Sequence, residues 1–85
     1  MYSAEDIQVR LQQQPFQPLR IIASEGLRFE IYHPDLVMVG RHDIMIGSPS
    51  LENQSVYDRV TRVALVHIVA LEELPMASSP KNGQG

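Results

Sequence analysis

The sequence predicts a small α+β protein that is mostly β, with an N-terminal helix followed by about five short antiparallel strands. These strands are expected to form a small barrel or a strongly bent sheet. Three observations predict this fold class. A capped, amphipathic stretch covers residues 3–13, and two apolar segments with period two then flank a turn at Gly26. A run of strand-forming side chains extends from Val56 to Leu74.

The predicted helix over residues 3–13 begins at Ser3, whose hydroxyl can cap it. Asp6, three residues later, completes a capping-box pattern, and Pro15 ends the helix. The narrow apolar stripe consists of Ala4, Ile7 and Leu11. A helix of this length is marginal alone in water, so it must dock on the rest of the domain.

The first predicted hairpin joins Leu19–Ala23 to Leu27–His33, because both segments alternate with period two. Gly26 supplies the positive φ that a tight hairpin loop requires. On the second segment we expect Leu27, Phe29 and Ile31 to form one face, with Arg28, Glu30 and Tyr32 opposite. Every other side chain of the hairpin then faces away from the core.

A second hairpin is predicted from Asp35–Val39 and Asp43–Ile46. Residues 36–39 are continuously apolar, which indicates burial on both faces or coverage by the helix. The hairpin therefore gives the N-terminal helix a place to dock.

The last part of the chain is less regular. The polar segment 48–55 is rich in turn formers, and Val56–Val63 alternates only loosely. Residues 64–74 are compatible with one long strand, a short helix, or a 3₁₀ turn followed by a strand. The turn followed by a strand is preferred, because Val63–Val69 is dense in β-branched residues.

Composition limits the domain and its surroundings. A chain of 85 residues has room for one core. We assign this core to residues 1–75, and the Ser-, Pro- and Gly-rich residues 76–85 are predicted to be disordered. The chain has no cysteine, and no segment approaches the roughly 18 apolar residues of a membrane span. We therefore expect a soluble, cytoplasmic protein without a membrane partner.

The charge pattern bears on nucleic-acid binding. The net charge is −3, and Lys81 is the only lysine. A nucleic-acid-binding domain normally shows a basic stripe, which is not visible here. Such binding would require the scattered arginines to share one face of the fold. The candidates for that face are Arg20, Arg28, Arg59 and Arg62.

The run from Phe16 to Pro34 reads F-x-P-L-R-I-x-x-S-x-G-x-x-F-E-I-x-H-P. It resembles the opening of a family of short uncharacterised bacterial proteins. Those proteins have a leader helix, a hairpin of the pattern PF.P..I...DG..F.V.HP and a closing LLHI..LE segment, which residues 65–68 and 71–72 match here. The resemblance spans residues 4–74 and implies a shape without an assigned activity.

A helix followed by about five short strands is also similar to the Sm-like small barrel, whose first hairpin turns at a glycine. The resemblance implies an RNA-binding module with an Asp-x-Met/His-Asn signature and an Arg-Gly or Lys-Gly pair. Here the corresponding segments read HPDLVMVG and GSPSLENQS, so neither signature is present. Nucleic acid is therefore disfavoured as a partner, even within a similar barrel.

Three histidines are the candidate metal ligands, because neutral imidazoles can bind zinc or nickel. His33, His42 and His67 are spaced nine and twenty-five residues apart, which matches no metal motif. No metal or cofactor is assigned. We expect His33 to hydrogen-bond a loop carbonyl beside Pro34, and His67 to be half-buried and bonded to backbone.

Two tyrosines and two arginines complete the candidate surface residues. Tyr32 and Tyr57 could present ring faces to a base or a peptide, although packing at the core and edge is the preferred interpretation. Arg28 and Arg59 are the charged candidates that such a surface would use.

No catalytic constellation is visible. None of the serines stands in a nucleophile elbow, and no glycine-rich loop could hold a phosphate. A barrel of this size also lacks a pocket of roughly 300 Å³. We therefore expect a protein without enzymatic activity.

The leading hypothesis is a protein-interaction or scaffolding module that associates through a sheet edge, with itself or with an unknown partner. It follows from residues 56–74, which carry more strand-forming apolar side chains than a small chain can cover. The alternatives are an Sm-like nucleic-acid-binding module and, third, a histidine-centred metal site.

Overall fold

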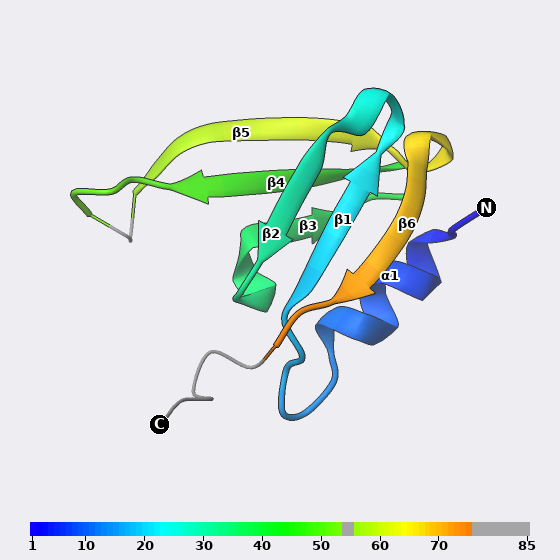
Figure 1. Cartoon of the computed structure of the whole chain (residues 1–85), viewed down its shortest axis with the longest axis horizontal. Coiled ribbons are helices and arrows are strands. Elements are labelled where there is room, and N and C mark those ends of the chain that lie inside the picture. The colour runs from blue at the N-terminus through cyan, green and yellow to red at the C-terminus, as the bar shows by residue number, and fades with distance from the viewer. Residues whose placement is uncertain (54–55, 76–85) are drawn as a thin grey trace.

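The computed structural model describes residues 1–53 and 56–75 of the chain. The described part contains helix α1 (Ala4–Leu11) and six strands. The strands are β1 (Leu19–Ala23), β2 (Arg28–Ile31), β3 (Val37–Val39), β4 (Asp43–Pro49), β5 (Tyr57–Ala64) and β6 (Ile68–Glu73). They pair antiparallel in two three-stranded sheets (Figure 1). The predicted α+β class is confirmed, with one strand more than expected.

Sheet A has the order β2-β1-β6 and contains the first predicted hairpin. Leu19 lies opposite Ile31, and Ile21 lies opposite Phe29, so the apolar side chains of both strands share one face. The turn η1 (Ser24–Gly26) between them places Glu25 and Gly26 in the left-handed region, with φ values of 66° and 79°. The positive φ predicted for Gly26 is therefore confirmed, and the turn requires a second one.

Leu27 departs from the expected pattern of this hairpin. It follows the turn η1 (Ser24–Gly26), precedes the first residue of β2, and is exposed. The Ala23 amide donates to the Leu27 carbonyl, and this hydrogen bond closes the turn at the end of the sheet. Leu27 is therefore exposed, although the alternation predicts it on the same face as Phe29 and Ile31.

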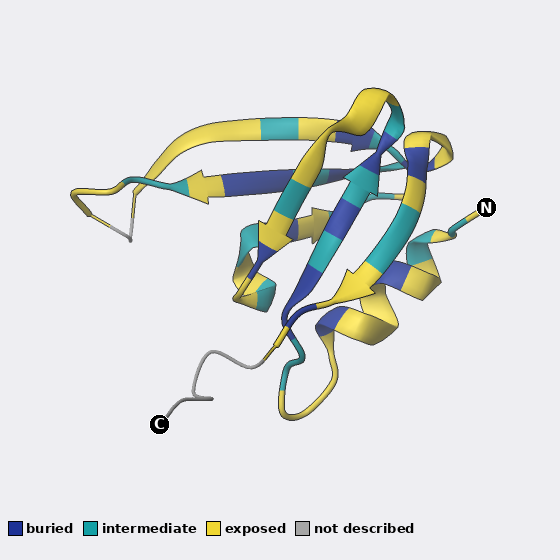
Figure 2. Ribbon diagram, in the orientation of Figure 1, coloured by how far each residue is buried: buried dark blue, intermediate teal, exposed yellow. Residues whose placement is uncertain are grey.

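Sheet B has the order β3-β4-β5. Its central strand β4 places Ile44 between Val39 and Val63, and Ile46 between Val37 and Thr61. This face of β4 is buried, as Figure 2 shows for the middle of the strand. The second predicted hairpin is thereby confirmed, and β5 extends it by a third strand.

The chain passes between the sheets at two corners, each a 3₁₀ turn. The turn η2 (Pro34–Leu36) separates β2 from β3, and the turn η3 (Leu65–His67) separates β5 from β6. Proline has no amide hydrogen to donate to a ladder, so Pro34 interrupts pairing where a longer strand could have continued. Across the described residues no ladder joins the two sheets, and the closed barrel is therefore not formed.

The preferred interpretation of residues 64–74 is confirmed, because η3 leads directly into β6. The expectation for residues 36–39 holds in part. Val37 is buried and β3 contacts α1, whereas Met38 is 65% exposed. Burial on both faces of β3 is therefore wrong, because the helix covers one face only.

The helix is shorter than the predicted 3–13. Ser3 is its N-cap: the Asp6 amide donates to the Ser3 hydroxyl and the Ser3 amide donates to the Asp6 carboxylate, as the capping box requires. Gln12 is the C-cap. The helix ends there because the polar residues that follow have no apolar side chain to bury.

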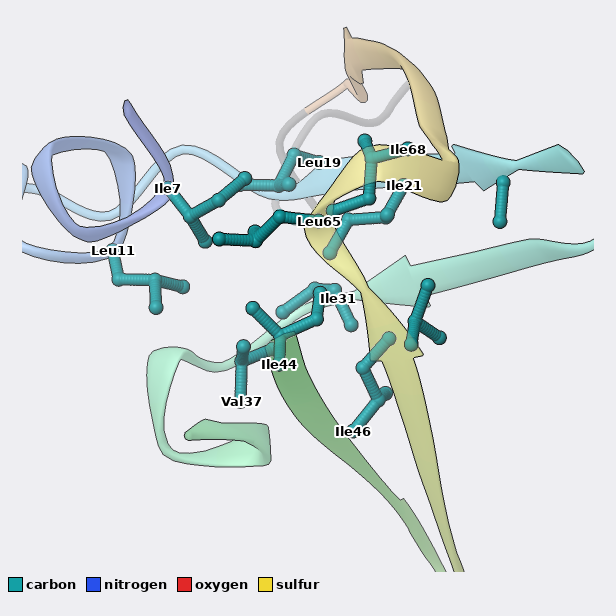
Figure 3. Packing of buried hydrophobic residues seen from close by; sticks show 12 residues of the cluster. Ile7, Leu11, Leu19, Ile21, Ile31, Val37, Ile44, Ile46, Leu65 and Ile68 are labelled. Atoms are coloured by element: carbon teal, nitrogen blue, oxygen red, sulfur yellow. The ribbon is translucent and has the colours of Figure 1, made fainter. Parts of the chain in front are cut away.

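The core lies between the two sheets and the helix. Figure 3 shows apolar side chains from all three meeting in one cluster. The largest fully buried side chains are Ile7, Ile21, Ile31 and Ile44. Since no ladder joins the sheets within the described residues, this cluster packs one sheet against the other.

Two expectations concern other parts of the chain. The predicted disorder of residues 76–85 lies outside the described residues. Among the residues that are described, no helix is long and apolar enough to cross a membrane.

We expect Ile44→Ala to lower the free energy of unfolding by about 2–5 kcal/mol, because it leaves a cavity at a site with 0% exposure. Val66→Ala is the matched control, since Val66 is 62% exposed and should change stability by less than about 0.5 kcal/mol. Urea unfolding followed by circular dichroism measures both. Equal effects of the two substitutions would contradict the assigned core.

The helix start should be sensitive to pH. Hydrogen bonds from the Ser3 amide and then its side chain lower the pKa of the Asp6 carboxyl. A carboxyl with a lowered pKa stabilises the fold above its unfolded pKa, and this contribution is lost as the pH falls through the folded pKa. The difference in Tm between the protein and its Asp6→Asn variant should therefore shrink below about pH 4. A difference that is constant through this range would contradict the assignment.

Candidate interaction surface

Strand β5 forms an open edge of sheet B. It has β4 on one side, and the figures place it at the margin of the molecule (Figures 1 and 2). All residues from Tyr57 to Val60 are exposed, whereas Val63 near the end of the strand is buried. The first half of β5 therefore extends past the core with both of its faces in solvent.

The hydrogen-bond pattern shows which backbone groups face this edge. The Leu65 amide donates to the His42 carbonyl at 2.9 Å, in the same register that pairs Ala64 with Asp43. Hydrogen-bonded and non-hydrogen-bonded pairs alternate along an antiparallel ladder. Every second residue counted back from Leu65 therefore points its amide and carbonyl toward β4. The residues between them, which include Val60 and Arg62, point their amides and carbonyls toward the open edge.

An apolar surface lies beside this edge, on the face of sheet B that is turned away from the core. We define the outer apolar surface by Leu36, Met38, Met45, Tyr57 and Val60. These side chains surround a hollow of about 150 Å³, with Gly47 and Asp35 completing its lining. Met38 and Val60 are 65% and 52% exposed, so the surface is open to a partner.

Tyr57 is built into this surface. Its hydroxyl donates to the Asp35 carbonyl at 3.2 Å, which links the start of β5 to the corner before β3. Its ring lies over Gly47, where a Cβ atom would be 3.0 Å from Tyr57 Cδ2. Edge packing, the preferred sequence interpretation, is thus what Tyr57 does here, and Tyr32 is exposed beyond the end of β2.

The arginines do not share one face. Arg59 and Arg62 are three residues apart on β5 and point to opposite faces, opposite Ser48 and Met45 respectively. Arg28 lies on sheet A, exposed and opposite Ile22. The common basic face required for nucleic-acid binding is therefore not formed by these side chains.

Arg20 is held in the middle of sheet A. Its guanidinium nitrogens lie 2.9 Å from a Glu30 carboxylate oxygen and 3.0 Å from a Glu72 oxygen, on the two neighbouring strands. Hydrogen bonds to Glu30 and then Glu72 raise the pKa of Arg20. Its positive charge is thus matched within the sheet and is not available for phosphate.

The three histidines occupy separate turns and all are exposed. His33 caps η2 through its carbonyl, and its imidazole has no partner among the described residues, so the expected side-chain hydrogen bond is wrong. His67 is exposed rather than half-buried, because it ends a corner turn, and its carbonyl accepts from the Ser24 hydroxyl. Within the described residues, no three His, Cys, Asp or Glu side chains are grouped to hold a metal.

A second hollow, of about 300 Å³, lies between the turn η1 and the end of β5, so the expectation that a domain of this size lacks such a pocket is wrong. Its walls include Leu27 and Val63, with Arg62 and His67 among its polar groups. Arg62 lies 3.4 Å from Asp43, and the His67 imidazole has no hydrogen-bonded partner in the described part of the chain. The hollow therefore lacks the hydrogen-bonded base and nucleophile that would mark a catalytic pair.

The sequence interpretation missed the outer apolar surface. Met38 and Val60 are separated by twenty-two positions and meet only through the register of sheet B. Period two along residues 36–39 could have assigned Met38 to the face opposite Val37. No local sequence pattern predicts that Gly47 lies under the ring of Tyr57.

Comparison with protein-family models, curated proteins and solved structures finds no match for this chain. The function must therefore be argued from the surface itself.

The contact between Gly47 and Tyr57 can be tested by a double-mutant cycle. In a Tyr57→Ala background, Gly47→Ala should stabilise the strand by about 0.5–1 kcal/mol, because alanine is less costly than glycine in a strand. In the native background the new methyl group displaces the ring, and the gain should vanish. Urea unfolding of the four proteins gives a coupling energy of about 0.5 kcal/mol or more. Additive effects would contradict the contact.

Proposed function

We propose that this protein is a non-enzymatic interaction module that binds a partner strand at the open edge of β5. One observation carries the proposal. The eight-residue strand β5 is exposed over its first half and borders the outer apolar surface. In strand addition, backbone groups provide affinity and neighbouring side-chain pockets provide selectivity.

The other open edges are less suited to strand addition. Strand β3 has three residues and β2 has four, so each offers few backbone groups. Strand β6 has six residues, but its last two, Glu72 and Glu73, are acidic and exposed. Two neighbouring charges of the same sign oppose pairing at that edge, whereas β5 carries charges of both signs in Asp58, Arg59 and Arg62.

The apolar surface adds a reason for binding. Exposed Met38 and Val60 lie on either side of β4, with the hollow between them. Burying these side chains against a partner removes apolar area from water, which is favourable by about 25 cal/mol per Å². An alternating partner strand on β5 would direct every second side chain toward this surface.

Val60→Pro should abolish strand addition and leave the fold intact. The Val60 amide faces the open edge, so proline removes a donor that the partner uses and none that β4 uses. Binding is measured by sedimentation equilibrium of the protein alone and by NMR amide shifts with a panel of extended peptides. Thermal unfolding checks that β5 remains folded.

Met38→Glu should weaken the same interaction by placing a charge on the apolar surface. Val9→Glu is the matched control, since Val9 is 59% exposed on α1 and does not line the outer apolar surface. If the protein neither self-associates nor shows peptide-induced NMR amide shifts in residues 57–62, the proposed function is wrong.

A further inference from the structure

We propose that the strand added to β5 is the β5 strand of a second copy, paired antiparallel about a two-fold axis at Val60. The inference rests on the proposed function and names its partner. It would make the two copies of sheet B into one continuous six-stranded sheet.

The order of charges along β5 favours this partner. Asp58 and Arg62 stand two residues before and two residues after Val60. The β4–β5 register shifts between Arg59 and Tyr57, so Asp58 lies at a bulge where the regular part of β5 ends. Antiparallel pairing centred on Val60 would bring Asp58 of each copy near Arg62 of the other, at both ends of the regular contact. Opposite charges across paired strands are stabilising and like charges are destabilising.

Both side chains are available for this contact. Asp58 is exposed and has no ion-pair partner among the described residues. The Arg62 side chain is 70% exposed and its contact to Asp43 is long, at 3.4 Å. A parallel arrangement in register would instead place Arg59 and Arg62 beside their own copies, which is repulsive.

The backbone supports the same centre. The amide and carbonyl of Val60 face the open edge, so two copies can exchange both hydrogen bonds at this residue. The Val60 side chains then lie side by side, next to the outer apolar surface of each copy. Cross-strand residues in such a pair have Cα atoms about 5.5 Å apart.

The edge charges also explain why pairing would stop at two copies. They pair only when both copies meet in this register, and the two-fold contact uses the β5 edge of both copies at once. The contact is thus closed, and it leaves no second β5 edge for growth.

The charge order can be tested by mixing two variants. Asp58→Arg alone and Arg62→Asp alone should each weaken the dimer about tenfold or more, because each places like charges at both ends of the contact. An equimolar mixture of the two variants should recover the dimer, since every pair is then opposite in charge. Sedimentation equilibrium measures all three samples.

A cysteine crosslink tests the position of the axis without relying on Arg62. The chain has no cysteine, so Val60→Cys introduces a single thiol. A Cα separation of about 5.5 Å lies within disulfide range, and mild oxidation should yield a covalent dimer. Val66→Cys, on the exposed corner η3, is the matched control and should remain monomeric.

The outcomes separate the inference from the proposed function. The inference is overturned if the native protein is a dimer but mixing the two variants does not restore the dimer and Val60→Cys forms no crosslink. That result would point to another edge such as β6. A monomer that binds extended peptides at residues 57–62 overturns the inference and keeps the proposed function. Absence of any association contradicts both.

Discussion

The apolar contact between the two sheets is the interaction on which the rest of the structure depends. Each sheet has three strands, and in the described residues no ladder connects them. Ile21 and Ile31 from sheet A meet Ile44 from sheet B in the shared core, and Ile7 covers it from the helix (Figure 3). A three-stranded sheet in a chain this small cannot bury its own apolar face, so neither sheet is expected to be stable without the other.

This constraint also positions the candidate surface. The buried face of β4 fixes the strand against the core through Ile44 and Ile46. The opposite face of the same strand then has to point outward, and it carries Met45 and Gly47. The open edge of β5 is therefore defined by the same packing that closes the core.

The parts of the fold that depend on local sequence could be predicted. Ser3 and Asp6 gave the start of the helix, and the strand preferences after Val63 gave the turn leading into β6. The division into two sheets could not be predicted from the sequence, because it depends on where strand pairing stops. Pro34 was visible in the sequence, but only the structure shows that pairing ends there and resumes in another sheet.

The candidate site was less predictable than the fold, since its residues meet through register. Met38 and Val60 lie on different strands, with β4 between them, and no local pattern connects them. The opposite orientation of Arg59 and Arg62 could have been read from their odd spacing within one strand. The exposure of His67 could not be predicted from the sequence, because it depends on how the chain turns at the corner before β6.

The double ion pair of Arg20 gives the molecule two unlike sides. Its two carboxylate partners on β2 and β6 make a charged cluster on the exterior of sheet A, whereas the exterior of sheet B carries the outer apolar surface. An assembly formed through sheet B consequently keeps a hydrophilic coat supplied by sheet A. These three charged side chains lie outside the proposed contact and would stay in solvent.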